Sequence, residues 1–145
     1  MEKFVDVILP LPLHACFTYS LPEDMAESVQ IGCRVVVPFG RKKYYTAIVQ
    51  NIHYSAPAGY EVKEVSALLD AHPILLPEQF RFWDWLADYY LCTRGDVYKA
   101  ALPPGLKLES ETIVEYNPDF ESDVQLPEKE QKILDLLAAE PEQCI

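Results

Sequence analysis

The chain has 145 residues, and 23 acidic side chains against 12 basic ones give it a net charge of −11. Half of its residues are hydrophobic, which is too apolar for a disordered polyelectrolyte and sufficient for one ordinary core. The sequence has no run of about 18 apolar residues, and prolines interrupt its mixed-charge N-terminus. We therefore expect a cytoplasmic protein with neither a membrane span nor a secretory signal.

The negative charge is concentrated in the last quarter of the chain. Residues 1–107 carry ten basic and twelve acidic side chains, a net charge of −2, whereas residues 108–145 carry two basic and eleven acidic ones, a net charge of −9. Since an acidic surface repels nucleic acid, the net charge of the whole chain argues against DNA binding. Since most of the negative charge lies in residues 108–145, this argument against DNA binding does not apply to residues 1–107.

The first 70 residues are rich in short β-patterned segments. These segments alternate apolar and polar residues or consist of β-branched runs, and turn signals containing Gly or Pro separate them. They predict five strands, over residues 4–9, 16–20, 33–37, 44–52 and 62–69. Short strands at this spacing are typical of a small, curved antiparallel sheet or barrel.

The apolar spacing then changes to three and four residues, which predicts a helix from Pro77 through Leu91. This helix is apolar around much of its circumference, so we expect the sheet to cover one side and another element to cover the other. Gly95 is predicted to end it, and a short second helix is predicted over residues 96–101. The predicted fold class is therefore α+β, mainly β, with one long packed helix.

The sequence predicts three parts: a first domain over residues 1–107, an acidic linker over 108–125, and the beginning of a second domain over 126–145. The last part contains an amphipathic helix over residues 127–137, with Pro and acids at its start. Its apolar stripe needs a partner that the remaining residues do not supply. We therefore expect an incomplete second domain.

No catalytic or metal-binding constellation is evident. The four cysteines form no CxxC pair, the three histidines have no spacing suited to a metal or a triad, and no GxxxxGK[ST] motif is present. A Cys/His hydrolase built on Cys16 or Cys33 would need a histidine that the spacing does not indicate. We therefore expect this chain to be neither an enzyme nor the holder of a cofactor or metal.

Five sequence blocks carry a family resemblance because they occur in one order and at one spacing. The blocks are Val7–Leu13, Phe17–Pro22, Gly32–Gly40, Ala87–Tyr90 and Gly95–Pro103. Together they resemble the N-terminal part of the primosomal protein N′ (PriA) family of bacterial replication-restart DNA helicases. The resemblance covers about residues 4–107 and continues weakly through the helix near 127–137, which is similar to the first helix of the family's winged-helix domain.

The resemblance implies a pocket for the 3′-terminal nucleotide of the nascent leading strand. Phe17 would line the pocket, the position of Thr18 would face the terminal sugar hydroxyl, and Gly40 would let the backbone approach the nucleotide. Lys63 would contact the nucleotide from the opposite wall. These roles suit the residue types, because an aromatic ring stacks on any base, glycine permits close approach and lysine meets a negative charge.

Thr18 departs from the family pattern, which has an aspartate between the two aromatic residues. A neutral hydroxyl is a weaker hydrogen-bond acceptor than a carboxylate, because charge-assisted hydrogen bonds are about twice as strong. The preference for a free 3′-hydroxyl is therefore reduced here, or another group supplies the acceptor. Asp6 and Glu64 are the two candidate substitutes.

Each of these residues also has a purely structural interpretation. Phe17 and Tyr19 share one face of an alternating strand, where an aromatic residue is commonly part of the core, and we assign Tyr19 to the core. Gly40 could serve only a turn, and Lys63 could be a solvated edge lysine. The triplet Arg41-Lys42-Lys43 could contact phosphates or could form a soluble hairpin tip.

The sequence thus predicts a targeting module that binds branched DNA, or a junction of single-stranded and duplex DNA, with a 3′ end. The resemblance implies that the full-length protein is an ATP-dependent 3′-to-5′ DNA helicase, with ATP, Mg and Zn bound in a region outside this chain. It also implies primosome proteins and single-stranded DNA-binding protein as partners, and no membrane. The alternative is a protein-interaction barrel that docks replication partners without recognising DNA ends.

Overall fold

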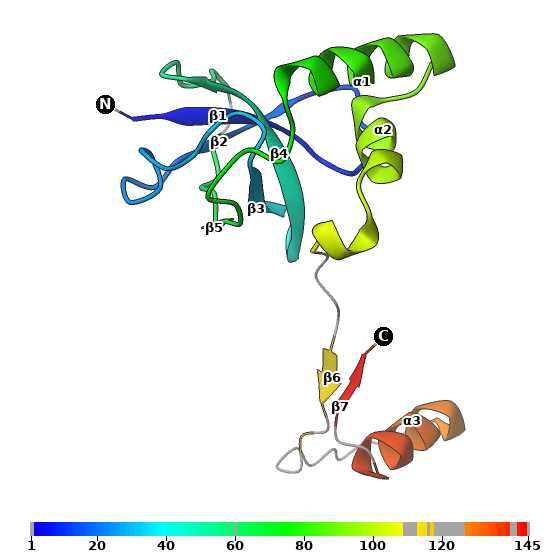
Figure 1. Cartoon of the computed structure of the whole chain (residues 1–145). Coiled ribbons are helices and arrows are strands. Elements are labelled where there is room, and N and C mark those ends of the chain that lie inside the picture. Colours follow the sequence, from blue (N-terminus) through cyan, green and yellow to red (C-terminus); the bar gives the residue numbers. More distant parts are fainter. Residues whose placement is uncertain are drawn as a thin grey trace. The chain divides into compact units, whose positions relative to one another are not determined.

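The computed structural model describes residues 2–59, 61–108, 113–115, 117, 127–139 and 142–144. The chain forms two compact units, Met1–Glu109 and Ser110–Ile145 (Figure 1). The first unit combines an antiparallel sheet with helices, which confirms the predicted α+β class. In the described part of the chain, no helix has the length and apolarity needed to cross a membrane.

The sheet of the first unit has five strands in the order β2-β1-β4-β3-β5, all paired antiparallel. The strands are β1 (Phe4–Ile8), β2 (Phe17–Ser20), β3 (Arg34–Phe39), β4 (Lys43–His53) and β5 (Ala67–Leu68). The first four agree with the predicted strands to within two residues at each end. The fifth is only two residues long, so Lys63 lies outside any strand.

An isolated parallel bridge connects β2, at one edge of the sheet, to the segment before β5, at the other edge. Ser20 of β2 donates its N–H to the Lys63 carbonyl (3.0 Å) and accepts from the Val65 N–H (3.0 Å). The Ser66 N–H then donates to the Val36 carbonyl of β3 (2.8 Å). The sheet is therefore open, and the segment 63–66 joins its two edges at one point only.

One face of the sheet carries the larger of two hydrophobic cores. Alternate residues of three neighbouring strands point into it, which is the period expected for a strand. Tyr19 is buried there as predicted, and its hydroxyl lies 3.1 Å from the Pro38 carbonyl. The fully buried members from β1, β3 and β4 are Val5, Val7, Val35, Val37, Ala47 and Val49.

The opposite face of the sheet packs against α1 (Pro77–Tyr90) and α2 (Arg94–Ala101). Ile48 of β4 points to this side, where it joins Trp83 and Tyr98 in the second core. The Trp83 and Tyr98 rings stack with centroids 5.9 Å apart, and the Tyr98 hydroxyl donates to the Thr46 carbonyl of β4 (2.8 Å). Packing and a buried hydrogen bond therefore hold the two helices against β4, the central strand.

Leu91, and not Gly95, ends the long helix. Leu91 adopts the left-handed conformation (φ 52°), and its N–H donates to the Ala87 carbonyl. Gly95 lies inside α2, where a Cβ atom would be only 1.8 Å from the Leu11 carbonyl oxygen. The prediction that Gly95 ends the helix is therefore wrong, because this glycine is needed for the close approach of α2 to the loop between β1 and β2.

The solvent side of α1 presents a row of three stacked aromatic side chains, and Tyr90 at the end of the helix is also exposed. Phe82, Trp85 and Tyr89 are 55%, 55% and 65% exposed, and consecutive rings stack with centroids 6.0 and 5.1 Å apart. We expected both sides of this helix to be covered. In the described part of the chain only the side that carries Trp83 and Ala87 is buried.

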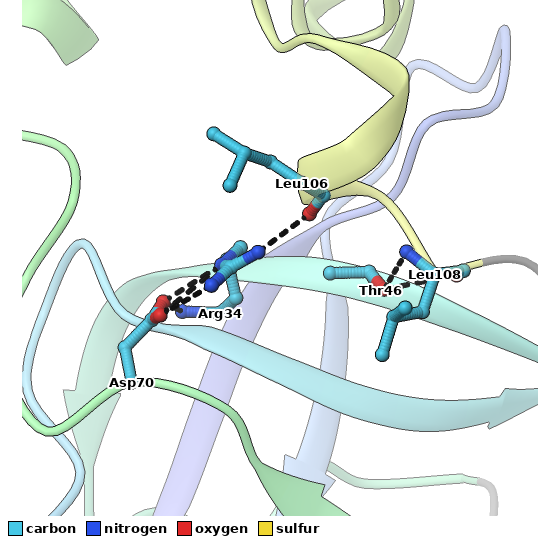
Figure 2. Close-up of polar contacts among 5 residues, drawn as sticks. All are labelled: Arg34, Thr46, Asp70, Leu106 and Leu108. Atoms are coloured by element: carbon cyan, nitrogen blue, oxygen red, sulfur yellow. Dashed lines mark hydrogen bonds and ion pairs between the residues drawn. The ribbon is translucent and has the colours of Figure 1, made fainter.

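Polar contacts hold the end of the first unit on the sheet (Figure 2). Arg34 of β3 forms a bidentate ion pair with Asp70, at 2.6 Å for the shortest contact, and also donates to the Leu106 carbonyl (2.8 Å). The Thr46 hydroxyl donates to the Leu108 carbonyl (2.9 Å) and accepts from the Leu108 N–H (2.8 Å). The chain is therefore fixed to β3 and β4 up to residue 108, beyond the short 3-10 helix η1 (Pro104–Leu106).

The second unit contains α3 (Glu128–Ala139) and a two-stranded antiparallel sheet of β6 (Ile113–Glu115) and β7 (Glu142–Cys144). The helix predicted over residues 127–137 is confirmed. Most of the predicted linker over residues 108–125 lies outside the described residues, so its character stays a prediction.

Candidate DNA-binding site

The first unit brings four of the predicted site residues to one cavity of about 180 Å³. It lies between β2 and the turn that follows β3. This volume is below the range of about 300–1,000 Å³ usual for small-molecule sites, so the cavity suits a single ring system. Its lining residues are Phe17, Thr18, Tyr19, Pro38, Phe39, Gly40, Glu61 and Lys63.

Phe17 is half-buried and serves both the core and the cavity. Its ring meets that of Phe39 edge-on, with centroids 5.1 Å apart and planes at 80°. Phe39 in turn packs edge-on against Tyr45, with centroids 6.1 Å apart. These neighbours restrict the Phe17 ring, so its orientation is set before any ligand arrives.

Gly40 and Lys63 meet across the mouth of the cavity. Gly40 has φ 72°, a conformation that L side chains rarely adopt, and no atom lies within 4 Å of where its Cβ would be. Its carbonyl accepts a hydrogen bond from the Lys63 Nζ (2.7 Å). The turn glycine thus leaves an open approach to the backbone, and its carbonyl holds the ammonium group at the rim.

A second cavity of about 310 Å³ adjoins the first and shares Pro38, Gly40 and Lys63 with it. Its remaining lining residues are Arg41, Lys42, Lys43 and Tyr44. The basic triplet is exposed and makes no ion pair within the described residues. Four cations therefore surround the two cavities against the one carboxylate of Glu61, a balance that favours an anionic group such as phosphate.

The Thr18 hydroxyl is engaged away from this pair of cavities. It donates to Asp6 Oδ1 (2.7 Å), and the Asp6 carboxylate also accepts from Asn51 (3.3 Å) and lies 3.2 Å from His53 Nε2. Partial burial by itself would raise the pKa of Asp6, but these hydrogen bonds outweigh it and lower the pKa. Of the two candidate substitutes for the family's aspartate, Asp6 is thus in contact with Thr18, whereas Glu64 is exposed on the bridge segment.

Three lining residues were not singled out from the sequence. Phe39 and Pro38 directly precede Gly40, so their nearness to the glycine could have indicated them. Glu61 gave no signal in the sequence, because it lies in a loop that no local pattern places at this cavity.

A larger cavity of about 540 Å³ lies between the loop after β1 and the corner joining α1 and α2. Its wall carries Asp84 and Asp88, and the guanidinium of Arg94 is already paired with Asp84 (2.6 Å). Carboxylates repel phosphate and the arginine is occupied, so this cavity is a poorer site for nucleic acid.

Comparison with known proteins agrees with the geometry. Residues 6–103 match the family model described as the PriA 3′ DNA-binding domain. The chain belongs to this family. The first unit is therefore a DNA-binding module, and it contains the two cavities described above. Residues 111–145 match a winged helix domain, beginning within the segment predicted as a linker.

The replication restart proteins PriA of two bacteria are among the relatives. The Haemophilus influenzae protein is 38% identical over 108 residues, which cover 72% of this chain and 14% of that protein. The Bacillus subtilis protein is 32% identical over 120 residues, which cover 81% of this chain and 15% of that protein. The chain thus spans about one seventh of the length of these relatives.

Proposed function

We propose that the first unit captures the 3′ end of a DNA strand at a stalled replication fork and so targets a restart helicase to it. The observation that carries the proposal is that an aromatic cavity and a cationic cavity adjoin and share Lys63. A terminal nucleotide has the same two parts side by side, a flat base and a phosphate on its 5′ side.

The residues suggest how each part is bound. The base enters the smaller cavity beside Phe17, where stacking contributes about 1–3 kcal/mol per base and does not depend on base identity. The preceding phosphate lies against Lys63 and the basic triplet. A module with a net charge of −2 has few phosphate contacts, which suits a pocket for one strand end better than a long track along the duplex.

The relatives' name, replication restart protein PriA, supports a wider role in replication restart. We propose that the full-length protein acts in the cytoplasm as an ATP-dependent 3′-to-5′ helicase, with ATP, magnesium and zinc bound by its helicase region. Its substrate would be branched or junction DNA with a 3′ end. Its partners would be primosome proteins and single-stranded DNA-binding protein.

Fluorescence anisotropy on the 145-residue chain tests the proposal. The probes are a fork with a free 3′ end at the junction and the same fork with a continuous strand. We expect tighter binding to the free end, and Phe17→Leu, which keeps an apolar side chain but loses the ring, to weaken it by about 5- to 100-fold. Lys63→Met should weaken binding and reduce its salt dependence.

Two matched variants control for general effects. Phe82→Leu removes an exposed ring on α1, and Lys99→Met removes a cation on α2 that lines neither cavity. Both should bind the free-end fork as the parent does. Equal affinity of the parent for both forks would rule out end capture, and unchanged binding by Phe17→Leu would rule out this pocket.

A second candidate function, docking of a replication partner protein, is supported by the row of Phe82, Trp85 and Tyr89. Soluble proteins rarely expose contiguous apolar patches of this kind without a partner. The row lies on the solvent side of α1, and its residues line neither of the two cavities. Trp85→Ala should therefore leave DNA binding unchanged, whichever partner the row contacts.

A further inference from the structure

The aromatic row on α1, which consists of Phe82, Trp85 and Tyr89, has acidic neighbours along one flank. A helix has 3.6 residues per turn, so Asp84 and Asp88 lie one above the other, between the buried side of the helix and the row. Both carboxylates line the 540 Å³ cavity between the loop after β1 and the corner of the two helices. The exposed rings are therefore adjacent to a hollow with an acidic wall.

The charges on α1 leave one carboxylate without a counter-ion. Arg81 pairs with Glu78 (3.3 Å), and Asp84 pairs with Arg94 of α2 (2.6 Å). Asp88 is exposed and makes no ion pair within the described residues. This flank of the row therefore offers a negative charge to whatever lies on the rings.

The sign of this charge distinguishes between two kinds of ligand for exposed stacked rings. Platforms for single-stranded DNA combine aromatic rings with a positively charged groove that follows the backbone. On α1 the unpaired charge is a carboxylate, and the guanidinium groups of Arg81 and Arg94 are both engaged in ion pairs. A carboxylate repels phosphate and attracts a cation, so the charge favours a protein partner over nucleic acid.

We propose that the row docks a segment of a partner protein that places an apolar side chain on the rings and an arginine or lysine beside Asp88. This inference rests on the second candidate function and specifies the chemistry of the partner. Tryptophan is the aromatic side chain that holds a cation best, and aromatic residues dominate the binding energy of many interfaces. Asp88 gains the counter-ion that it lacks, and the adjoining cavity has room for a long basic side chain.

An uncharged apolar partner is the rival explanation. Such a partner would bury the rings without using the charge beside them. The rival therefore needs Trp85 alone, whereas the proposal needs both Trp85 and Asp88.

Nuclear magnetic resonance on the isotope-labelled 145-residue chain tests the proposal. The chain has two tryptophans, so their indole N–H signals separate the exposed Trp85 from the buried Trp83. The probes are three acetylated and amidated pentapeptides with glycine at both ends, leucine next to each glycine, and arginine, glutamine or glutamate at the centre. The arginine peptide should shift the Trp85 signal and bind about 3- to 10-fold more tightly than the glutamine peptide, and the glutamate peptide should bind most weakly.

Two variants identify the groups responsible. Trp85→Ala should weaken binding of all three peptides by about fivefold or more, as read from the Tyr89 backbone amide. Asp88→Asn should reduce the preference for arginine over glutamine by about 2- to 5-fold and leave the glutamine peptide unaffected. The matched controls Tyr54→Ala and Asp24→Asn change an exposed ring and an exposed carboxylate that line none of the three cavities, and both should bind the peptides as the parent does.

Equal affinity for the arginine and glutamine peptides would overturn the inference, as would a preference for arginine that survives Asp88→Asn. Either result leaves docking at the row intact. Tighter binding of a single-stranded oligothymidylate, abolished by Trp85→Ala, would overturn the inference in favour of a DNA platform. No shift of the Trp85 signal with any peptide at millimolar concentration would overturn both the inference and the second candidate function, whereas end capture is judged separately by the two forks.

Discussion

The tightest backbone approach in the first unit predicts a strong effect of Gly95→Ala. Gly95 belongs to α2 and faces the loop after β1, where an added Cβ would lie 1.8 Å from the Leu11 carbonyl oxygen and 2.6 Å from that of Leu9. Real Cβ atoms essentially never come within 3.0 Å of such atoms. The loop or α2 must therefore move by more than 1 Å, on the order of a bond length.

Two opposing terms set the magnitude. Alanine is favoured over glycine inside a helix by about 1 kcal/mol. Overpacking costs about 1–3 kcal/mol, and the upper end applies because the obstacle is backbone and not the tip of a flexible side chain. We expect Gly95→Ala to lower the free energy of unfolding by about 2 kcal/mol, the difference between these terms.

Urea denaturation followed by tryptophan fluorescence measures this loss. The matched control is Gly105→Ala in η1, where nothing lies within 4 Å of the added Cβ. It should change the free energy of unfolding by less than about 0.5 kcal/mol. An unfolding midpoint for Gly95→Ala equal to that of the parent would refute the argument from close approach.

Three further substitutions test the packing and the ion pair. Asp70→Asn should lower the free energy of unfolding by about 3 kcal/mol at pH 7, because Arg34 is left unpaired in a site where these side chains are only 15% and 8% exposed. Hydrogen bonding from Arg34 lowers the pKa of Asp70, so the stability that this ion pair gives the parent should be lost as the pH falls below about 4. Urea unfolding midpoints of the parent and of Asp70→Asn at pH 7 and pH 3 measure this loss. A difference between the two midpoints that is equal at both pH values would contradict the prediction. Trp83→Ala should lower the free energy of unfolding by about 3–5 kcal/mol, because Trp83 is buried, whereas the exposed Trp85 should lose less than about 1 kcal/mol on substitution by alanine. Thermal unfolding measures both losses, and equal losses would contradict the assigned burial.

Local patterns were sufficient to predict most of the elements. The β-branched run before Pro38 and the apolar spacing after Pro77 each depend on neighbours along the chain, and both gave elements of the predicted type. Gly95 was misassigned because a glycine after a helix commonly terminates it. A glycine is needed at this position because the Leu11 carbonyl lies against it, and Leu11 is 84 positions away in the sequence and leaves no local signal.

In the candidate site, too, local features could be predicted from the sequence and long-range contacts could not. The residue types of Phe17, Gly40 and Lys63 were visible in the sequence, and the structure brings them to one cavity. The presence of Glu61 at the same cavity was not visible, because the position of its loop depends on pairing with β2, a strand about 40 positions earlier in the sequence. Long-range pairing of this kind has no signature in the composition of either segment.

The central strand β4 has a consequence for how the first unit unfolds. Ala47 and Val49 belong to one core and Ile48 to the other, so consecutive residues of one strand serve both. Because both cores depend on this strand, we expect the unit to unfold as a single cooperative block with one calorimetric transition. The cavity walls, formed by β2 and the turn between β3 and β4, are then complete only in molecules in which both cores are intact.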